Sequence, residues 1–322
     1  MPKNLMGGIL ILVAITAIWA LFALILTNFG VQASTLIVAA VGGMITGAFF
    51  PKIRISLSKS GTLVFATRWM LRAGIVLYGL RLGLSQLQDV GIAGISVAVI
   101  TVVSVLGVGV FLGRVFGMDK ESTLLVSAGS AICGAAAILA VQSVVQARTD
   151  KVVVAVATVV VFGTLGMLIY PLALEGINNS FVQGLITGGT LHEVAHVVGA
   201  GSAMGEESAN TAIIVKMIRV MLLVPVLFVL AWKKGEGDIR GSVPWFALGF
   251  IAVVGLNSIV NVPFKEVWFL LDTALLSVAM CALGIQTEVG QIKRMGPKPF
   301  LLAFTLMGVL ALIGLAIIWI YA

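Results

Sequence analysis

Stretches of about 20 mostly apolar residues recur along almost the whole chain, with only short polar breaks between them. A helix of that length crosses the roughly 30 Å hydrocarbon layer of a bilayer. We therefore predict an all-α polytopic membrane protein of about eleven transmembrane helices, in which residues 1–322 form a single transmembrane domain. The predicted spans, with ends uncertain by about 2–4 residues, are 5–27, 33–50, 64–84, 90–112, 122–147, 151–173, 181–204, 208–232, 242–260, 264–286 and 299–321.

The composition excludes a soluble protein. Hydrophobic residues make up 60% of the chain and charged residues 10%, whereas a soluble domain is about half apolar and a quarter charged. The formal charge of +7 suits loops that orient a membrane protein, so we expect no nucleic-acid partner. The two cysteines, Cys133 and Cys281, lie inside apolar segments rather than in loops, so we expect no disulfide framework.

Basic residues gather in alternate loops. One set of loops holds Lys3; Lys52, Arg54 and Lys59; Arg114 and Lys120; Lys233, Lys234 and Arg240; and Lys293, Arg294 and Lys298. The other set holds only Arg81, Arg148, Lys151 and Lys265. This asymmetry predicts a cytoplasmic N-terminus and, with an odd number of spans, a C-terminus outside. The first apolar run is longer than the 7–15 residues of a signal peptide core, so we expect a retained helix rather than a cleaved leader.

A weak internal repeat recurs at a period of about 147 residues. The segment from Arg68, RWMLRAGIVLYGL, aligns with the segment from Val215, VKMIRVMLLVPVL. Five predicted spans separate the matched elements, so the two copies would enter the membrane from opposite sides. We predict an extra first helix at 5–30, a first repeat at 33–173 and an inverted second repeat at 181–322. Chance alignment of apolar segments is the alternative.

Two segments carry small residues at mid-membrane depth. SAGSAICGAAAI surrounds Cys133, and LSVAMCALGIQT surrounds Cys281. We predict that a discontinuous helix at each segment exposes N–H groups that bind an anion. Close helix packing through small residues is the alternative.

Four basic residues of the predicted membrane region are not accounted for by any loop. Arg68 and Arg72 are four residues apart and Lys216 and Arg219 are three apart, so each pair shares a helix face. We expect Arg68 and Lys216 to reach the membrane interface and Arg72 and Arg219, one turn deeper, to face an acid or a bound anion. Glu193 and Asp272 are the main acids available inside the membrane.

The segment TLHEVAHVVGAG contains the only two histidines. His192 and His196 with Glu193 match the His-Glu-x-x-His pattern of zinc metalloproteases, in which both histidines lie on one helical face. An intramembrane zinc protease using residues 192–196 is therefore an alternative function. A third metal ligand with suitable spacing is missing, so we favour a transport role in which His192 or Glu193 carries protons.

TLHEVAHVVGAG, VKMIRVMLLVP, SAICGAAAI and VVVFGTLGMLIYP together resemble the YeiH-type family (UPF0324) of bacterial inner-membrane proteins, for which sulfate export has been suggested. The resemblance covers nearly the whole chain, although the family carries Gln at the position of His196. The family is similar in architecture to bile acid:sodium symporters and sodium/proton antiporters. That similarity implies a panel domain, a core domain and two crossing discontinuous helices, at Ser130–Gly134 and Ala279–Gly284.

These observations predict a secondary transporter and not an enzyme. Its solute would be a small anion, sulfate or an organic sulfonate or carboxylate, exported across the inner membrane by alternating access. We expect no catalytic residue, metal or cofactor. Coupling to H⁺, coupling to Na⁺ and uniport are all compatible with the sequence, and by analogy with carriers of this shape a homodimer is a possible assembly. The predicted solute-binding residues are Ser130, Ala131, Cys133, Gly134, Arg72, Arg219, His192, Glu193, Cys281 and Gly284.

Overall fold

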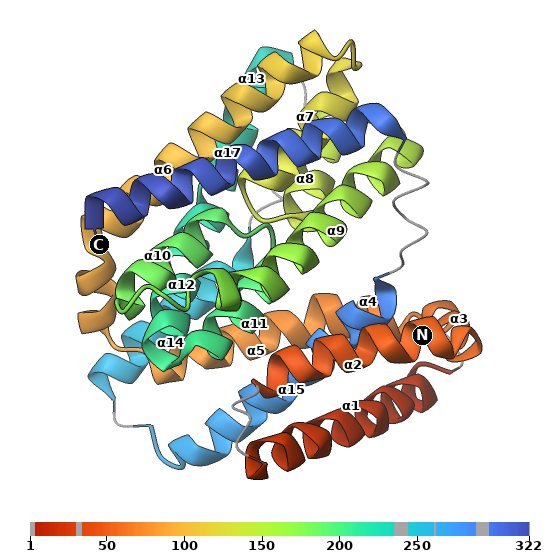
Figure 1. Cartoon of the computed structure of the whole chain (residues 1–322), viewed down its shortest axis with the longest axis vertical. Helices are drawn as coiled ribbons and strands as arrows, with labels where there is room; N and C mark the ends of the chain where they lie inside the picture. The colour runs from red at the N-terminus through yellow and green to blue at the C-terminus, as the bar shows by residue number, and fades with distance from the viewer. Residues whose placement is uncertain (1–3, 30–33, 235–243, 261, 288–295, 322) are drawn as a thin grey trace. The chain divides into compact units, whose positions relative to one another are not determined.

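The computed structural model describes residues 4–29, 34–234, 244–260, 262–287 and 296–321. These residues form helices and turns and contain no strand, which confirms the all-α prediction. Helices dominate because a backbone surrounded by hydrocarbon can satisfy its N–H and C=O groups only within the chain. Figure 1 shows the helices in chain order by colour.

Seven described helices are long and apolar enough to cross a membrane, or up to eight if one bent pair counts as a span. The seven are Leu5–Asn28, Thr62–Arg81, Leu84–Val115, Thr149–Ala173, Glu206–Trp232, Lys265–Gln286 and Pro297–Tyr321. Three shorter apolar helices are Ala135–Val145, Val194–Met204 and Trp245–Ile259. The chain is therefore a multi-pass membrane protein; the number of eleven spans stays a prediction.

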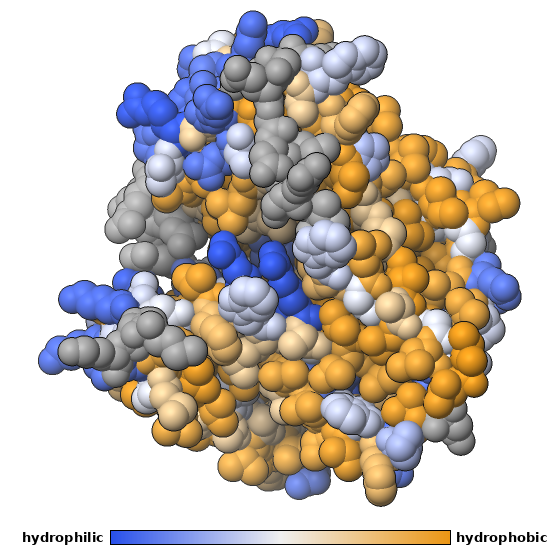
Figure 2. Space-filling view, turned by 180° about the vertical axis from the view of Figure 1, so that it is seen from behind, coloured by the Kyte–Doolittle hydropathy of each residue, from blue (hydrophilic) through white to orange (hydrophobic). Residues whose placement is uncertain are grey.

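Apolar side chains are exposed along several of these helices. Leu10 and Leu21, Val103 and Leu312 are each more than half exposed. Figure 2 shows one face of the chain on which apolar residues predominate. A soluble protein would bury most of this surface, whereas contact with lipid tails accounts for it.

The chain divides into two compact units, and each draws on both halves of the sequence. The first contains residues 1–87 and 246–288, and the second contains residues 88–245 and 289–322. The two-repeat division at 33–173 and 181–322 stays a prediction.

The first unit comprises helices from the start and the end of the chain. They are α1 (Leu5–Asn28), α2 (Thr35–Phe49), α3 (Pro51–Lys59), α4 (Thr62–Phe65), the π-helical turn η1 (Ala66–Met70), α5 (Leu71–Tyr78), the 3₁₀ turn η2 (Gly79–Arg81), α14 (Trp245–Ile259) and α15 (Lys265–Gln286).

The prediction of a discontinuous helix at Ala279–Gly284 is wrong. α15 runs unbroken from Lys265 to Gln286, and Gly284 has no positive φ. The small residues serve close packing: a Cβ added at Gly284 would overlap the Ala40 carbonyl of α2, and one added at Gly43 would overlap the Cys281 carbonyl. Small residues let two helix backbones approach, which explains the composition without a break.

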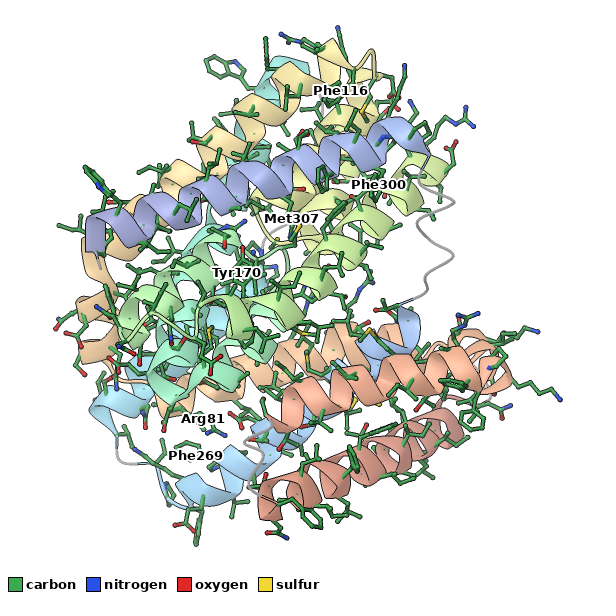
Figure 3. All side chains as sticks on the ribbon, in the orientation of Figure 1. Arg81, Phe116, Tyr170, Phe269, Phe300 and Met307 are labelled. Atoms are coloured by element: carbon green, nitrogen blue, oxygen red, sulfur yellow. The ribbon has the colours of Figure 1, made fainter. Side chains whose placement is uncertain are left out.

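A partly buried ion pair joins η2 to α15 in this unit. The Arg81 guanidinium donates to both Asp272 carboxylate oxygens, from Nε at 2.8 Å and Nη2 at 2.7 Å, and to the Phe269 carbonyl at 2.9 Å. Arg81 also lies over the Phe269 ring, 4.7 Å from its centroid (Figure 3). Asp272 therefore pairs with Arg81, which is the last residue of the candidate span Thr62–Arg81, although the charge pattern of the sequence assigned Arg81 to a loop.

The remaining helices form the second unit. They are α6 (Leu84–Val115), most of which belongs to it, α7 (Lys120–Ala131), α8 (Ala135–Val145), α9 (Thr149–Ala173), α10 (Ser180–Thr190), α11 (Val194–Met204), α12 (Glu206–Met221), α13 (Leu223–Lys234) and α17 (Pro297–Tyr321). Side-chain caps begin α7 and α10: Asp119 accepts from the Ser122 N–H at 3.1 Å, and Asn179 accepts from the Val182 N–H at 3.2 Å.

The contact between α2 and α15 gives a first prediction. Gly284→Ala should lower the free energy of unfolding by about 1–3 kcal/mol, because its methyl group overlaps the Ala40 backbone. Gly255→Ala in α14 is the matched control, since a Cβ there meets no atom within 4 Å. Its better helix propensity should leave stability unchanged or slightly raised. Thermal unfolding of the detergent-solubilised variants measures both, and equal midpoints would contradict the packing account.

Candidate functional site

The break predicted at Ser130–Gly134 is present. α7 ends at Ala131, and α8 begins only at Ala135. Gly134 has φ 72° and ψ −131°, a conformation that strongly favours glycine. Cys133 lies in the break and is buried.

The second break of this unit lies in the histidine segment. α10 ends at Thr190 and α11 begins at Val194, while Leu191 and Glu193 are extended, with ψ 151° and 156°. This break, rather than one near Cys281, accompanies the break between α7 and α8. Gly188 and Gly189 just before it lie within α10, and a Cβ added at Gly188 would overlap the Ala212 carbonyl of α12, so this pair serves close packing and does not by itself signal the break.

The break also separates the two histidines. His192 precedes α11, whereas His196 lies within it, so the expectation that both share a helical face is wrong. His196 instead packs on α9: a Cβ added at Gly163 would overlap its ring, and its Nε2 is 3.5 Å from the Thr164 hydroxyl. The zinc-protease hypothesis required both histidines on one face of a single helix, and the structure does not have that arrangement. Among the described residues, no group of three or more His, Cys, Asp or Glu is placed to hold a metal ion.

Each interrupted helix ends in carbonyl groups that no helical N–H can satisfy. Lys216 of α12 reaches both ends. Its ammonium donates to the carbonyls of Ile132 at 2.8 Å, Leu191 at 2.6 Å and His192 at 2.8 Å. These contacts use all three donors of a lysine.

Arg219, one turn further along α12, bonds to further carbonyls at both helix ends. Its hydrogen bonds run from Nε to the carbonyl of Ala131 (3.2 Å), from Nη1 to those of Gly188 (3.1 Å), Gly189 (2.8 Å) and Leu191 (2.9 Å), and from Nη2 to those of Ser130 (3.1 Å) and Ala131 (2.7 Å). Both side chains are completely buried. The prediction that Lys216 extends to the membrane interface is therefore wrong.

The same contacts correct the predicted chemistry at Ser130–Gly134. The Ile132 and Gly134 N–H groups bond to the carbonyls of Ala128 and Gly129, so they are not free for an anion. The break presents carbonyl oxygens instead, and the negative ends of the α7 and α10 dipoles attract the two cations.

The N-terminus of α8, on the far side of the break from α7, faces Glu193. The Glu193 Oε1 atom accepts from the Ala135 N–H at the start of α8, at 3.0 Å. A Cβ added at Gly134 would overlap the Glu193 side chain, so glycine is required for this approach. A carboxylate thus lies at the positive end of the α8 dipole.

Several buried polar atoms around the breaks have no hydrogen-bond partner among the described residues. They are Ser130 Oγ, Thr187 Oγ1, both ring nitrogens of His192 and Nδ1 of His196. Buried polar groups are nearly always paired with protein, water or ligand. The second unit therefore has unused hydrogen-bonding capacity at the place where its helices are interrupted.

Tyr170 was not predicted as a site residue. Its hydroxyl lies 2.8 Å from Thr190 Oγ1, at the last residue of α10, and Figure 3 labels it near the centre of this unit. It reaches α10 from α9. Nothing in the local sequence around Tyr170 indicates this contact.

The two cations of the third predicted span lie in the first unit, and Arg72 is the one that was predicted as a site residue. Arg72 is partly buried, with its guanidinium 5.4 Å from the centroid of the Phe246 ring. Arg68 is exposed, as expected for a side chain that reaches the interface. Cys281 and Gly284 belong to the α2–α15 contact of the same unit. The assembled centre of the second unit therefore consists of Ser130, Ala131, Cys133, Gly134, His192, Glu193, Lys216 and Arg219.

Fold and site together define an all-α membrane protein in which two discontinuous helices meet at a buried charged centre. Residues 7–303 match the family model described as conserved hypothetical protein 698. The chain belongs to this family, the YeiH-type UPF0324 membrane proteins, as its motifs suggested.

Its relatives are similar along most of their length. A UPF0324 membrane protein of Pseudomonas aeruginosa is 42% identical over 305 residues, which cover 88% of this chain and 85% of the relative. The UPF0324 inner membrane protein YeiH is 43% identical in Salmonella typhimurium and 44% identical in Escherichia coli K12, each over 302 residues, 89% of this chain and 86% of the relative. No solved structure matches the chain. These names and the apolar helices identify a multi-pass inner-membrane protein.

The cation contacts give a second prediction. Arg219→Met should lower the free energy of unfolding by at least about 3 kcal/mol, because buried carbonyls of both broken helices lose their donors. Arg68→Met, at an exposed position, removes the same charge and is the control. The midpoint of thermal unfolding and the monodisperse fraction on size-exclusion chromatography report the effect. A wild-type midpoint for Arg219→Met would refute a structural role for the guanidinium.

Proposed function

We propose that this chain is a secondary transporter that exports a small anion, sulfate or an organic sulfonate or carboxylate, by alternating access. The anion would bind in the second unit at the breaks of α7/α8 and α10/α11. The observation that carries the proposal is the excess of positive charge buried there.

The charges of the centre do not cancel. Lys216 and Arg219 contribute two positive charges and Glu193 contributes one negative charge, so the formal sum is +1. Two helix C-termini and two helix N-termini meet there, and their dipoles offset one another to first order. A charge buried in a low-dielectric region costs several kcal/mol, and a bound anion would remove that cost.

The unpaired polar atoms supply ligands for such an anion. Ser130 Oγ and the His192 ring can each donate a hydrogen bond, and neither has a partner in the described part of the chain. Lys216 and Arg219 have their donors engaged by carbonyls, so they would act on the anion through their charge. This differs from direct coordination by Arg219, which the sequence favoured.

Glu193 is the proposed proton carrier. Its carboxylate holds the α8 N-terminus, a position that an anionic solute would also favour. Protonation of Glu193 would release that position, so that binding of the anion would be linked to binding of a proton. His192 lies beside it, and Lys216 and Cys133 are the other titratable groups near this carboxylate.

Proton coupling is preferred to sodium coupling because of the carbonyl contacts. The oxygens exposed by the two breaks could have bound Na⁺, but Lys216 and Arg219 take them. A cation of the protein thus fills the position that a metal ion would need.

Glu193→Gln tests this assignment in proteoliposomes loaded with radioactive sulfate. The amide oxygen can still accept from the Ala135 N–H, so the variant should fold, but it cannot carry a proton. We expect sulfate efflux to lose its dependence on an imposed pH gradient. Glu206→Gln, an exposed acid at the start of α12, should behave as wild type.

Two outcomes would count against the proposal. Unchanged dependence on the pH gradient in Glu193→Gln would remove the proton-carrier role. If sulfate, sulfonate and carboxylate solutes leave liposomes containing the wild-type protein no faster than they leave protein-free liposomes, the proposed transport function is wrong.

A further inference from the structure

The helix α3 is the feature of the first unit that the proposed transport function leaves unexplained. It has nine residues, PKIRISLSK, with three basic residues and no acidic one. It follows α2 at an angle of 104° (Figure 1). A helix that only continued a membrane span would keep the direction of α2.

Local sequence fixes the bend. Pro51 is the first residue of α3 and has no N–H to continue the ladder of α2. The residue before a proline avoids the helical region, and Phe50 has φ −120° and ψ 68°. At the other end, Gly61 has φ 74° and donates its N–H to the Ser58 carbonyl at 3.0 Å, which stops the helix.

Packing holds one face of α3 against the unit. Leu57 is 1% exposed, and the Ser60 and Thr62 hydroxyls, 2.7 Å apart, join the end of α3 to the start of α4. α2 itself lies along α15, a candidate span, through the Gly43 and Gly284 contacts. If α15 crosses the membrane, α2 runs with it and α3 lies close to the membrane plane.

The exposed face of α3 combines positive charge with apolar groups. Lys52 and Lys59 are seven residues apart, which places them on the same face, and both are exposed. Neither ammonium has an ion-pair partner within the described segments. Ile55 on this face is 48% exposed, and Phe49 and Phe50 at the bend are 76% and 57% exposed.

From this arrangement we infer that α3 is an interfacial helix that binds the phosphate headgroups of anionic lipids through Lys52 and Lys59. The aromatic rings at the bend and Ile55 enter the acyl boundary, while the two ammonium groups remain at headgroup level. Charge complementarity selects anionic over zwitterionic lipid. The inference is independent of the transported solute.

A lipid titration tests the inference. Short-chain phosphatidylglycerol is titrated into the full-length protein in a neutral detergent, with short-chain phosphatidylcholine as the uncharged reference, and binding is followed by the thermal unfolding midpoint. The double variant Lys52→Gln/Lys59→Gln should bind phosphatidylglycerol roughly 10- to 30-fold more weakly than wild type. Added salt should reduce the wild-type affinity, since the contacts are exposed.

The control is Arg148→Gln/Lys265→Gln, which removes the same charge from the starts of α9 and α15 and should bind phosphatidylglycerol as wild type does. Equal affinity of the α3 variant and wild type would overturn the inference, and so would an equal loss in the control. Soluble glycerol phosphate is a further arm: if it stabilises the protein as well as phosphatidylglycerol does, the site is a phosphate site rather than a lipid surface.

If the α3 variant fails to fold, a spin label attached at position 56, in place of Ser56, in the otherwise native protein tests whether α3 lies at the membrane interface. In liposomes containing phosphatidylglycerol, its depth should lie at the headgroup boundary. Accessibility equal to that of a fully aqueous label would contradict the inference.

Discussion

Helices that stop inside a membrane protein leave carbonyl groups without helical partners, and in the second unit two side chains of α12 donate hydrogen bonds to carbonyls at both breaks. Lys216 and Arg219 bond to the ends of both α7 and α10. One helix therefore joins two interruptions that lie about 60 residues apart in the chain. The breaks can persist only because the compensating cations are buried with them.

This compensation is asymmetric, and the asymmetry connects structure to function. The carbonyl ends have two cations, whereas the N–H ends have the single carboxylate of Glu193. An exchangeable anion at the N-termini that follow the breaks would neutralise the remaining positive charge, and this charge balance is the physical basis of the proposed transport. The first unit contains no comparable excess at Arg81, because Asp272 neutralises it directly.

The sequence predicted the fold class, the family and the break at Gly134 because apolar length, motif combination and a glycine in a membrane segment are local signals. It misplaced the second break because small residues serve both interruption and close packing, and only the contact of Gly284 with Ala40 separates the two. The Arg81–Asp272 pair spans 191 residues, and no local pattern reveals it. The spacing of Lys216 and Arg219 did predict a shared face, but not that carbonyls would be their partners.

Calorimetric titration of sulfate into the purified protein at acid and neutral pH, in buffers of different ionisation enthalpy, tests the central claim most directly. The account predicts saturable binding near one anion per chain, accompanied by proton uptake that disappears in Glu193→Gln. Absence of binding for sulfate and for organic sulfonates and carboxylates, with the protein folded and both cations intact, would contradict it.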